Sequence, residues 1–186
     1  MPIPTLTTAR AVLRPFVLED LAELVGVHAE ESFWWYPLRG AMTTEQTAAF
    51  LVRTIERYET DGFGIEAVID RFTGAMIGCA GLAVPHFLPE VLPAVEVGWR
   101  LSGPYRGRGL ATEIGRAAVD WGFTTGGLTR LVSIYEPENL ASGKVMGHLG
   151  FTPALSTTHP GRGDAILVTE LSREQWAADR SAYSTE

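Results

Sequence analysis

The sequence predicts a mixed α/β domain whose sheet is largely antiparallel, and three observations carry this prediction. Predicted helices follow predicted strands along the whole chain. Two strand-like runs, 63–70 and 75–83, flank a turn-forming segment as they do in a β-hairpin. No internal repeat or low-complexity segment interrupts the 186 residues. We expect a single domain over residues 1–175, followed by a C-terminal tail over 176–186.

The first third of the chain alternates short elements. A strand over 11–16 precedes a helix that has acidic residues in its first turn, and we expect His28 near the end of that helix to be a surface or dipole-paired residue rather than a ligand. A second helix begins at Thr43, which forms a capping box with Gln46, and it ends at Gly62.

The rest of the chain continues the alternation. Three prolines make 84–94 a loop, after which a strand runs over 94–101. A helix over 109–125 has its apolar residues on one side and stops at two glycines. The remaining elements are a strand over 130–135, a helix over 139–149, strands over 151–156 and 164–171, and a short helix in the tail.

Composition excludes several classes of function. The net charge of −7 argues against nucleic acid as a partner, because phosphate neutralisation needs a basic surface. The single cysteine, Cys79, lies in an apolar run, allows no disulfide within the chain, and is expected to be a buried spectator rather than a nucleophile or metal ligand. No signal peptide or membrane-spanning run is evident, so we expect a cytoplasmic protein without a membrane partner or a metal.

Residues 96–112 read as a strand, a sharp turn and a glycine-rich helix start. Gly107 and Gly109 let backbone N–H groups converge at the positive end of a helix, which favours a phosphate-bearing ligand. The spacing differs from the dinucleotide fingerprint, and the turn lies too late in the chain for it. The amides of 106–112 are suited to cradle a pyrophosphate, with charge from Arg106 and Arg108, although such a turn can also simply join a strand to a helix.

Four ordered motifs resemble the GNAT superfamily of N-acetyltransferases. Arg106-Gly107-Arg108-Gly109-Leu110-Ala111 matches its Gln/Arg-x-x-Gly-x-Gly/Ala motif. Pro137-Glu138-Asn139-Leu140-Ala141-Ser142 with His148-Leu149-Gly150-Phe151 matches the helix and strand that close its coenzyme A cleft. Leu13-Arg14-Pro15-Phe16 with Glu19-Asp20, and Glu96-Val97-Gly98-Trp99-Arg100-Leu101, are similar to the RimJ/RimL-like branch.

The resemblance implies both a fold and a reaction. The fold is a mixed, mostly antiparallel sheet of six to seven strands, flanked by helices and splayed between the fourth and fifth strands. The reaction moves an acetyl group from acetyl-CoA to a primary amine, either a protein N-terminus or a small molecule, by direct attack and without a metal. A homodimer is compatible with this family.

The resemblance also implies roles for particular residues. Glu96 is expected to be the general base, although a structural carboxylate is the alternative. The amide of Val97 or Gly98 is expected to stabilise the oxyanion. Asn139 is expected to bind pantetheine, cap its helix, or do both. The expected cofactor-binding residues are Val97, Gly98, Trp99, Leu101, Arg106, Gly107, Arg108, Gly109, Leu110, Ala111, Thr112, Asn139 and Ser142.

A donor for the leaving thiolate is less clearly marked. Many relatives have a tyrosine where this chain has Met146, which cannot donate a proton. Ser142 matches a serine of the RimJ/RimL-like branch and is the expected donor, with an ordinary helix residue as the alternative. Tyr135 and Tyr105 are the other candidates.

The acceptor side is predicted from aromatic residues. Trp34, Trp35, Tyr36 and Phe87 are the expected substrate-binding residues, which suits an amine with an apolar body or a peptide N-terminus. Alternatively, two of the aromatic residues 33–36 pack inward. Two other functions stay open: a non-catalytic acyl-CoA-binding regulatory module, and an interaction protein that uses the aromatic stretch.

Overall fold

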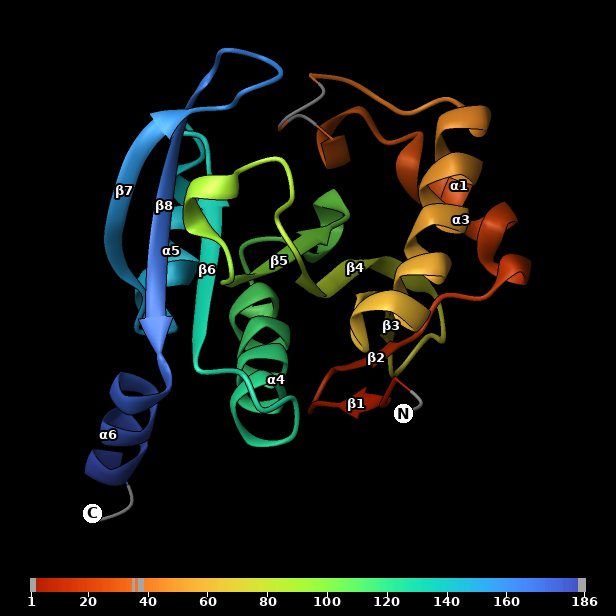
Figure 1. Ribbon diagram of the computed structural model, residues 1–186. Helices are drawn as coiled ribbons and strands as arrows, with labels where there is room; N and C mark the ends of the chain where they lie inside the picture. The colour runs from red at the N-terminus through yellow and green to blue at the C-terminus, as the bar shows by residue number, and fades with distance from the viewer. Residues whose placement is uncertain (1–2, 35, 37–38, 184–186) are drawn as a thin grey trace. The chain divides into compact units, whose positions relative to one another are not determined.

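The computed structural model describes residues 3–34, 36 and 39–183 (Figure 1). The chain divides into two compact units, Met1–Ala83 with Gly98–Ala118 and Val84–Val97 with Val119–Glu186. The boundary between the units falls inside two elements, strand β5 (Val95–Leu101) and helix α4 (Leu110–Thr124).

Hydrogen-bonded strands follow the order β1-β2-β3-β4-β5-β6-β8-β7, in one eight-stranded sheet. Strands β5 and β6 pair in parallel, whereas the other pairs with a described register are antiparallel. The mixed, mostly antiparallel sheet is confirmed, with one strand more than the six to seven expected. The extra strand is β1 (Leu6–Thr7), whose two residues are too few to show any alternation in the sequence. The others are β2 (Ala11–Arg14), β3 (Ile65–Asp70), β4 (Met76–Ala83), β6 (Arg130–Tyr135), β7 (Thr152–Thr158) and β8 (Ala165–Ser172).

The first unit buries side chains on both faces of its strands. Helices α1 (Leu21–His28) and α3 (Thr44–Asp61) lie side by side and share a core with Ala67 of β3 (Figure 1). The next residue, Val68, packs in a second core with Leu110 and Ile114 of α4. Successive residues of a strand point to opposite faces, so β3 contributes to both cores. Short 3-10 turns lie at Leu18–Asp20, Glu31–Trp34, Pro89–Val91 and Gly103–Tyr105.

The ends of α3 follow the local signals in the sequence. The Gln46 N–H donates to Thr43 Oγ1 at 3.2 Å, and the Thr43 N–H donates to Gln46 Oε1 at 2.8 Å. Gly62 ends the helix with φ +75°, a conformation that favours glycine. The predicted capping box and helix end are both confirmed.

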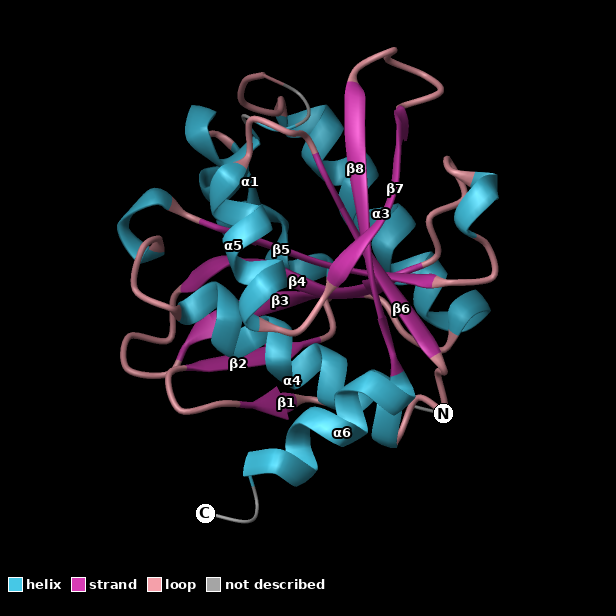
Figure 2. Ribbon diagram, turned by 90° about the vertical axis from the view of Figure 1, so that its left-hand side faces the viewer, coloured by secondary structure: helices cyan, strands magenta, loops and turns pink. Residues whose placement is uncertain are grey.

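The second unit is built on β6, β8 and β7. Figure 2 shows β7 and β8 as long paired strands, and their register is antiparallel. Helix α5 (Leu140–His148) contacts β6, and α6 (Arg173–Tyr183) contacts β8. Helix α6 therefore runs across residue 175, where we expected the domain to end. None of the helices in the described ranges is long and apolar enough to cross a bilayer.

Glu66 of β3 is a buried carboxyl that the sequence did not mark. Its side chain is 4% exposed, on the same face of β3 as Val68, and burial raises its pKa to about 8. The folded state therefore keeps a proton that the unfolded chain loses near its ordinary carboxyl pKa. The contribution of Glu66 to stability falls as the pH rises from about 4.5 to about 8, and it is constant above that window.

We predict that Glu66→Gln raises the free energy of unfolding at pH 8.5 by about 1–3 kcal/mol, with little effect at pH 4, because an amide needs no proton to stay neutral. Urea titrations at both pH values measure this difference. Glu56→Gln, at an exposed position of α3, serves as the control. An equal effect of Glu66→Gln at both pH values would contradict the prediction.

Candidate functional site

The glycine-rich turn has the backbone that the sequence predicted. Gly107 and Gly109 have φ of +70° and +74°, in the left-handed region where a side chain is disfavoured. Helix α4 begins at Leu110, and the Gly109 carbonyl accepts the Glu113 N–H at 3.1 Å. The amides that precede Glu113 in this first turn have no acceptor within the helix. An exposed turn with such amides is typical of an anion site.

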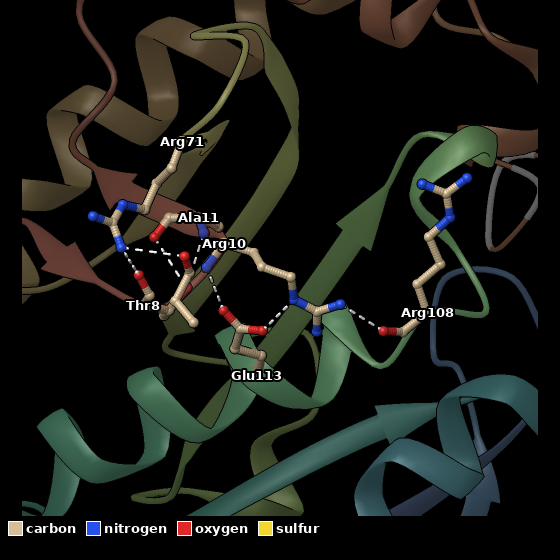
Figure 3. Close-up of polar contacts among 7 residues, drawn as sticks. Thr8, Arg10, Ala11, Arg71, Arg108 and Glu113 are labelled. Carbon is tan, nitrogen blue, oxygen red and sulfur yellow. Dashed lines mark hydrogen bonds and ion pairs between the residues drawn. The ribbon is translucent and has the colours of Figure 1, made fainter.

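The two arginines of this turn have different surroundings. The Arg106 guanidinium donates to the carbonyls of Leu101 at 2.7 Å and Ser32 at 2.9 Å, so that it ties the turn to two other segments. The Arg108 side chain is exposed and extends away from Arg10 (Figure 3). Arg108 is therefore the better placed of the two to meet an anionic ligand.

Arg10 holds the turn from the opposite direction, and the sequence analysis missed it. Its Nη1 donates to the Arg108 carbonyl at 2.8 Å, and its Nε donates to Glu113 Oε2 at 2.7 Å (Figure 3). The Arg10 N–H donates to Glu113 Oε1 at 2.8 Å. The only signal available was its position just ahead of the Leu13-Arg14-Pro15-Phe16 motif.

Backbone direction along β5 separates the predicted pantetheine-binding residues into two sets. The Ser102 N–H donates to Ile77 of β4 at 2.9 Å, which fixes the direction at one end of the strand. The N–H and C=O of a strand residue point to the same edge, and this edge alternates along the strand. Gly98 therefore points its backbone groups towards β4, as Ser102 does. Val97, Trp99 and Leu101 point theirs away from β4.

Contacts within the second unit agree with this assignment. The Val97 carbonyl accepts the buried Ser133 hydroxyl at 2.9 Å, from strand β6. Any contact of the Val97 carbonyl with a ligand would therefore be shared with Ser133. The carbonyl of Leu101 is also engaged, by Arg106 as described above.

Glu96 lies where the ladder between β5 and β6 ends. The register joins two pairs, Val95 with Leu131 and Glu96 with Val132. The break predicted between the strands at 94–101 and 130–135 is thus found at β5 and β6. The Glu96 side chain is half-buried, between the buried residues Val95 and Val97.

The residues predicted on and beside α5 lie in the second unit. The Asn139 carboxamide oxygen accepts the Ser142 N–H at 3.2 Å, so the helix-capping role is confirmed. An alanine Cβ at Gly143 would lie 3.4 Å from the Tyr135 hydroxyl oxygen, so this hydroxyl reaches the turn of α5 that carries Ser142. Met146 is buried and its sulfur accepts the Thr169 hydroxyl at 3.3 Å, which makes it a packing residue.

The predicted acceptor residues have mixed surroundings. Trp34 is 8% exposed, and the Arg100 guanidinium lies 4.4 Å from its ring centre. Arg100 also donates to the Tyr36 carbonyl. Phe33 and Trp34 both belong to the core, as the inward-packing alternative predicted, while Trp35 lies outside the described residues.

Phe87, in the second unit, is 38% exposed and stacks on His159 with ring centres 4.8 Å apart. It is therefore accessible to a ligand on the surface of that unit. The His159 side chain also accepts the Gly161 N–H at 3.1 Å, which holds its ring within the loop that joins β7 to β8.

The expectation that His28 lies at the surface was wrong. Its side chain is fully buried among Phe33, Trp34 and Phe50, and its Nδ1 lies 3.2 Å from Thr47 Oγ1. Burial, aided by the Arg100 charge, lowers its pKa to about 4, so this ring is neutral at pH 7. Cys79 is also buried, and its thiol pKa is raised to about 11 by burial, as a spectator requires.

Comparison with known proteins identifies the family. Residues 10–152 match the acetyltransferase (GNAT) domain family. The chain belongs to this GNAT family. It is 28% identical over 148 residues to the uncharacterized N-acetyltransferase p20 of Bacillus licheniformis, covering 79% of this chain and 82% of that protein. The family model covers both the glycine-rich turn and Glu96.

Solved GNAT structures share the fold. An acetyltransferase of Agrobacterium tumefaciens is 28% identical, with a TM-score of 0.75, over 92% of this chain and 95% of that one. RimL, a ribosomal L7/L12 α-N-protein acetyltransferase in complex with coenzyme A, is 15% identical with a TM-score of 0.73, over 91% and 98% of the two chains. At this identity the likeness to RimL shows the fold alone. The GNAT α/β fold of this chain is thus established.

We predict that Gly109→Ala lowers the free energy of unfolding by about 1–2 kcal/mol, because an alanine at φ +74° is strained. Thermal melting measures the effect. Gly26→Ala is the matched control, since Gly26 lies in α1 with nothing within 4 Å of an added Cβ. The control should stabilise the protein by about 0.5–1 kcal/mol. If the two variants changed stability by the same amount and in the same direction, the left-handed backbone assigned to Gly109 would be contradicted.

Proposed function

We propose that this GNAT protein transfers the acetyl group of acetyl-CoA to a primary amine by direct attack, with Glu96 as the general base. The observation that carries the proposal is the end of the β5–β6 ladder at Glu96, on the strand that leads into the glycine-rich turn. A carboxylate, an open row of strand amides and an anion-binding turn therefore follow one another within residues 96–112. These are the parts that a thioester and its diphosphate require.

The cofactor contacts follow from the backbone directions. The amides of residues 107–112 bind the pyrophosphate, because the Arg106 N–H already donates to the Gly103 carbonyl at 3.1 Å, and the exposed Arg108 adds charge. Trp99 offers pantetheine the backbone groups that point away from β4. Asn139 contributes its NH₂ group, because its oxygen already accepts the Ser142 N–H. Ser142 and the remaining residues of the turn and of β5 complete the set.

The two candidate oxyanion donors differ in backbone direction. The Gly98 N–H points towards β4, which leaves it turned away from the edge that Val97 and Trp99 present. The Val97 N–H lies on the edge that faces β6, where the parallel pair of Glu96 with Val132 already uses it, so both amides stay candidates for the oxyanion. Gly98 also supplies room, because an added Cβ there would meet nothing within 4 Å.

The reaction proceeds in two bond changes. Glu96 takes a proton from the acceptor ammonium, directly or through water, and the freed amine attacks the thioester carbonyl to form the new C–N bond. The oxyanion is stabilised by a backbone amide of Val97 or Gly98 until the C–S bond breaks and its electron pair leaves with sulfur. The nitrogen gives up its second proton in the same step, and this proton ends on the coenzyme A thiolate. Ser142 donates a hydrogen bond or proton to this thiolate, and Tyr135, whose hydroxyl reaches the same turn of α5, is the second candidate.

The acceptor is a primary amine on an apolar or peptide body. The accessible ring of Phe87 and the half-buried Tyr36 supply apolar surface, and Trp34 contributes from the core. Solved GNAT structures of this fold include RimL, a ribosomal L7/L12 α-N-protein acetyltransferase. The motifs that resemble the RimJ/RimL-like branch lead us to propose protein N-termini as the first acceptors to test.

We predict that Glu96→Gln lowers kcat at pH 7 by at least about 100-fold and leaves the Kd of acetyl-CoA unchanged, because only proton removal is lost. Coenzyme A release from a panel of amines and N-terminal peptides measures turnover, and calorimetry measures Kd. Glu174→Gln, at an exposed position of α6, is the control. Unchanged turnover in Glu96→Gln would remove Glu96 from the mechanism.

A second prediction ranks the two donor candidates. Ser142→Ala should lower kcat by less than Glu96→Gln does, because a thiolate is already a fair leaving group. Ser142→Thr keeps the hydroxyl and should retain more activity than Ser142→Ala. If Tyr135→Phe costs more than Ser142→Ala, the donor is the tyrosine, and a larger loss in Ser142→Ala than in Glu96→Gln would overturn the ranking.

Thermal melting with acetyl-CoA separates the proposed enzyme from its alternatives. At a hundredfold excess over Kd, a single-site ligand should stabilise the protein by about 2.7 kcal/mol. Stabilisation without turnover on the acceptor panel would favour the non-catalytic acyl-CoA-binding module. If acetyl-CoA does not stabilise the protein, an interaction protein is favoured and the proposed function is contradicted.

A further inference from the structure

Arg10 links two segments that are far apart in the sequence. Its guanidinium bonds the Arg108 carbonyl 98 residues away, and it pairs with Glu113, 103 residues away. One arginine thus holds both the last peptide of the glycine-rich turn and the first turn of α4. An Arg10 nitrogen, Nη2, also lies 3.8 Å from the position of a Cβ on Gly109.

The bond to the Arg108 carbonyl fixes the direction of the next amide. In a trans peptide the C=O of one residue and the N–H of the next point in opposite directions. With the Arg108 carbonyl turned towards Arg10, the Gly109 N–H is turned away from it, towards the side on which the Arg108 side chain extends (Figure 3). Because both glycines have left-handed backbones with few steric limits, this peptide needs an external contact to hold it.

The charge of Arg10 is balanced within the protein. Its Nε and backbone N–H both bond the Glu113 carboxylate. Burial raises the pKa of Glu113, but the hydrogen bonds from Thr8 and Arg10 outweigh it, so that the pKa lies below its ordinary value. Glu113 is therefore ionised at neutral pH, and Arg10 acts through the turn rather than as a phosphate ligand.

Hydrogen bonds from Arg71 hold the backbone around Arg10 in place. The Arg71 guanidinium donates to the carbonyls of Thr8 at 2.6 Å and Ala9 at 3.2 Å (Figure 3). The Arg71 N–H donates to the Arg10 carbonyl at 3.0 Å. The β3–β4 hairpin thus holds the backbone from which Arg10 reaches the turn.

We propose that Arg10, fixed by Glu113, is a positioning residue that turns the Gly109 amide towards the diphosphate of acetyl-CoA. This inference rests on the proposed function, and it makes a narrower claim. Loss of Arg10 should weaken the recognition of the diphosphate and spare the recognition of the thioester. A residue that merely stabilised the fold would affect both alike.

The test compares acetyl-CoA with S-acetylpantetheine, a thioester that has no diphosphate. Arg10→Ala should weaken acetyl-CoA binding by about tenfold, as expected for the loss of a charged hydrogen bond that orders the site. Turnover of S-acetylpantetheine, as kcat/KM, should stay within about twofold of the wild type. Arg53→Ala, at an exposed position of α3, removes the same charge and should change neither.

Two further variants test the mechanism of positioning. Arg10→Lys keeps the charge but not the planar fork that spans a carbonyl and a carboxylate, so it should lose most of the same affinity. Glu113→Gln should weaken acetyl-CoA binding, and its effect should be less than additive with that of Arg10→Ala, because both act through one contact.

The outcomes are distinct. Equal losses for both thioesters in Arg10→Ala, or full affinity in Arg10→Lys, would overturn the positioning role. Unchanged acetyl-CoA binding in Arg10→Ala would also overturn it, while a wild-type protein that binds acetyl-CoA would leave the proposed function standing. A wild type that binds and turns over neither thioester would instead refute the proposed function.

Discussion

Strand β5 is hydrogen-bonded to β6 over two residue pairs, and this short ladder is the constraint on which the account depends. If the pairing of β5 with β6 continued, it would use the β5 backbone groups that point away from β4. The ladder ends at Glu96 instead, and the next residue turns its carbonyl to the Ser133 hydroxyl. From that point, the strand can offer amides to a ligand that lies along it as a neighbouring strand would.

The charged residues divide into those that build the protein and those that can meet a ligand. Arg14 bonds the carboxylate of Asp20 at 2.7 and 2.8 Å, and Arg10 bonds Glu113. Arg106 bonds backbone carbonyls. Arg108, in contrast, extends from an exposed turn with two left-handed glycines. The local surplus of positive charge is therefore found where helix α4 also presents its amides, in a chain whose net charge is −7.

Local signals predicted most of the fold and the backbone of the turn. The capping box at Thr43 and the left-handed glycines depend on interactions within a few residues, and the sequence contains them in full. The resemblance located Glu96 and Asn139 by motif. The contacts of Arg10 could not be predicted in this way, because its partners are about a hundred residues away. Nothing in the neighbouring sequence distinguishes Arg10 from an arginine that makes no such contacts.

Burial of polar residues was also outside the reach of local patterns. His28 reads as a surface residue at the end of a helix, but three aromatic rings enclose it after the chain has folded. Glu66 lies in a strand whose sequence does not show which face is buried. Its burial depends on the side chains that pack against its face of the strand. Each of these surroundings is assembled by tertiary packing.

The most direct test of the central claim is an amide NMR titration of the wild-type protein with acetyl-CoA. We predict that the amide signals of Gly109, Leu110 and Ala111 shift together with those of Trp99 and Leu101, and that inorganic pyrophosphate moves only the first group. Saturating acetyl-CoA that left both groups of signals unmoved would contradict the central claim.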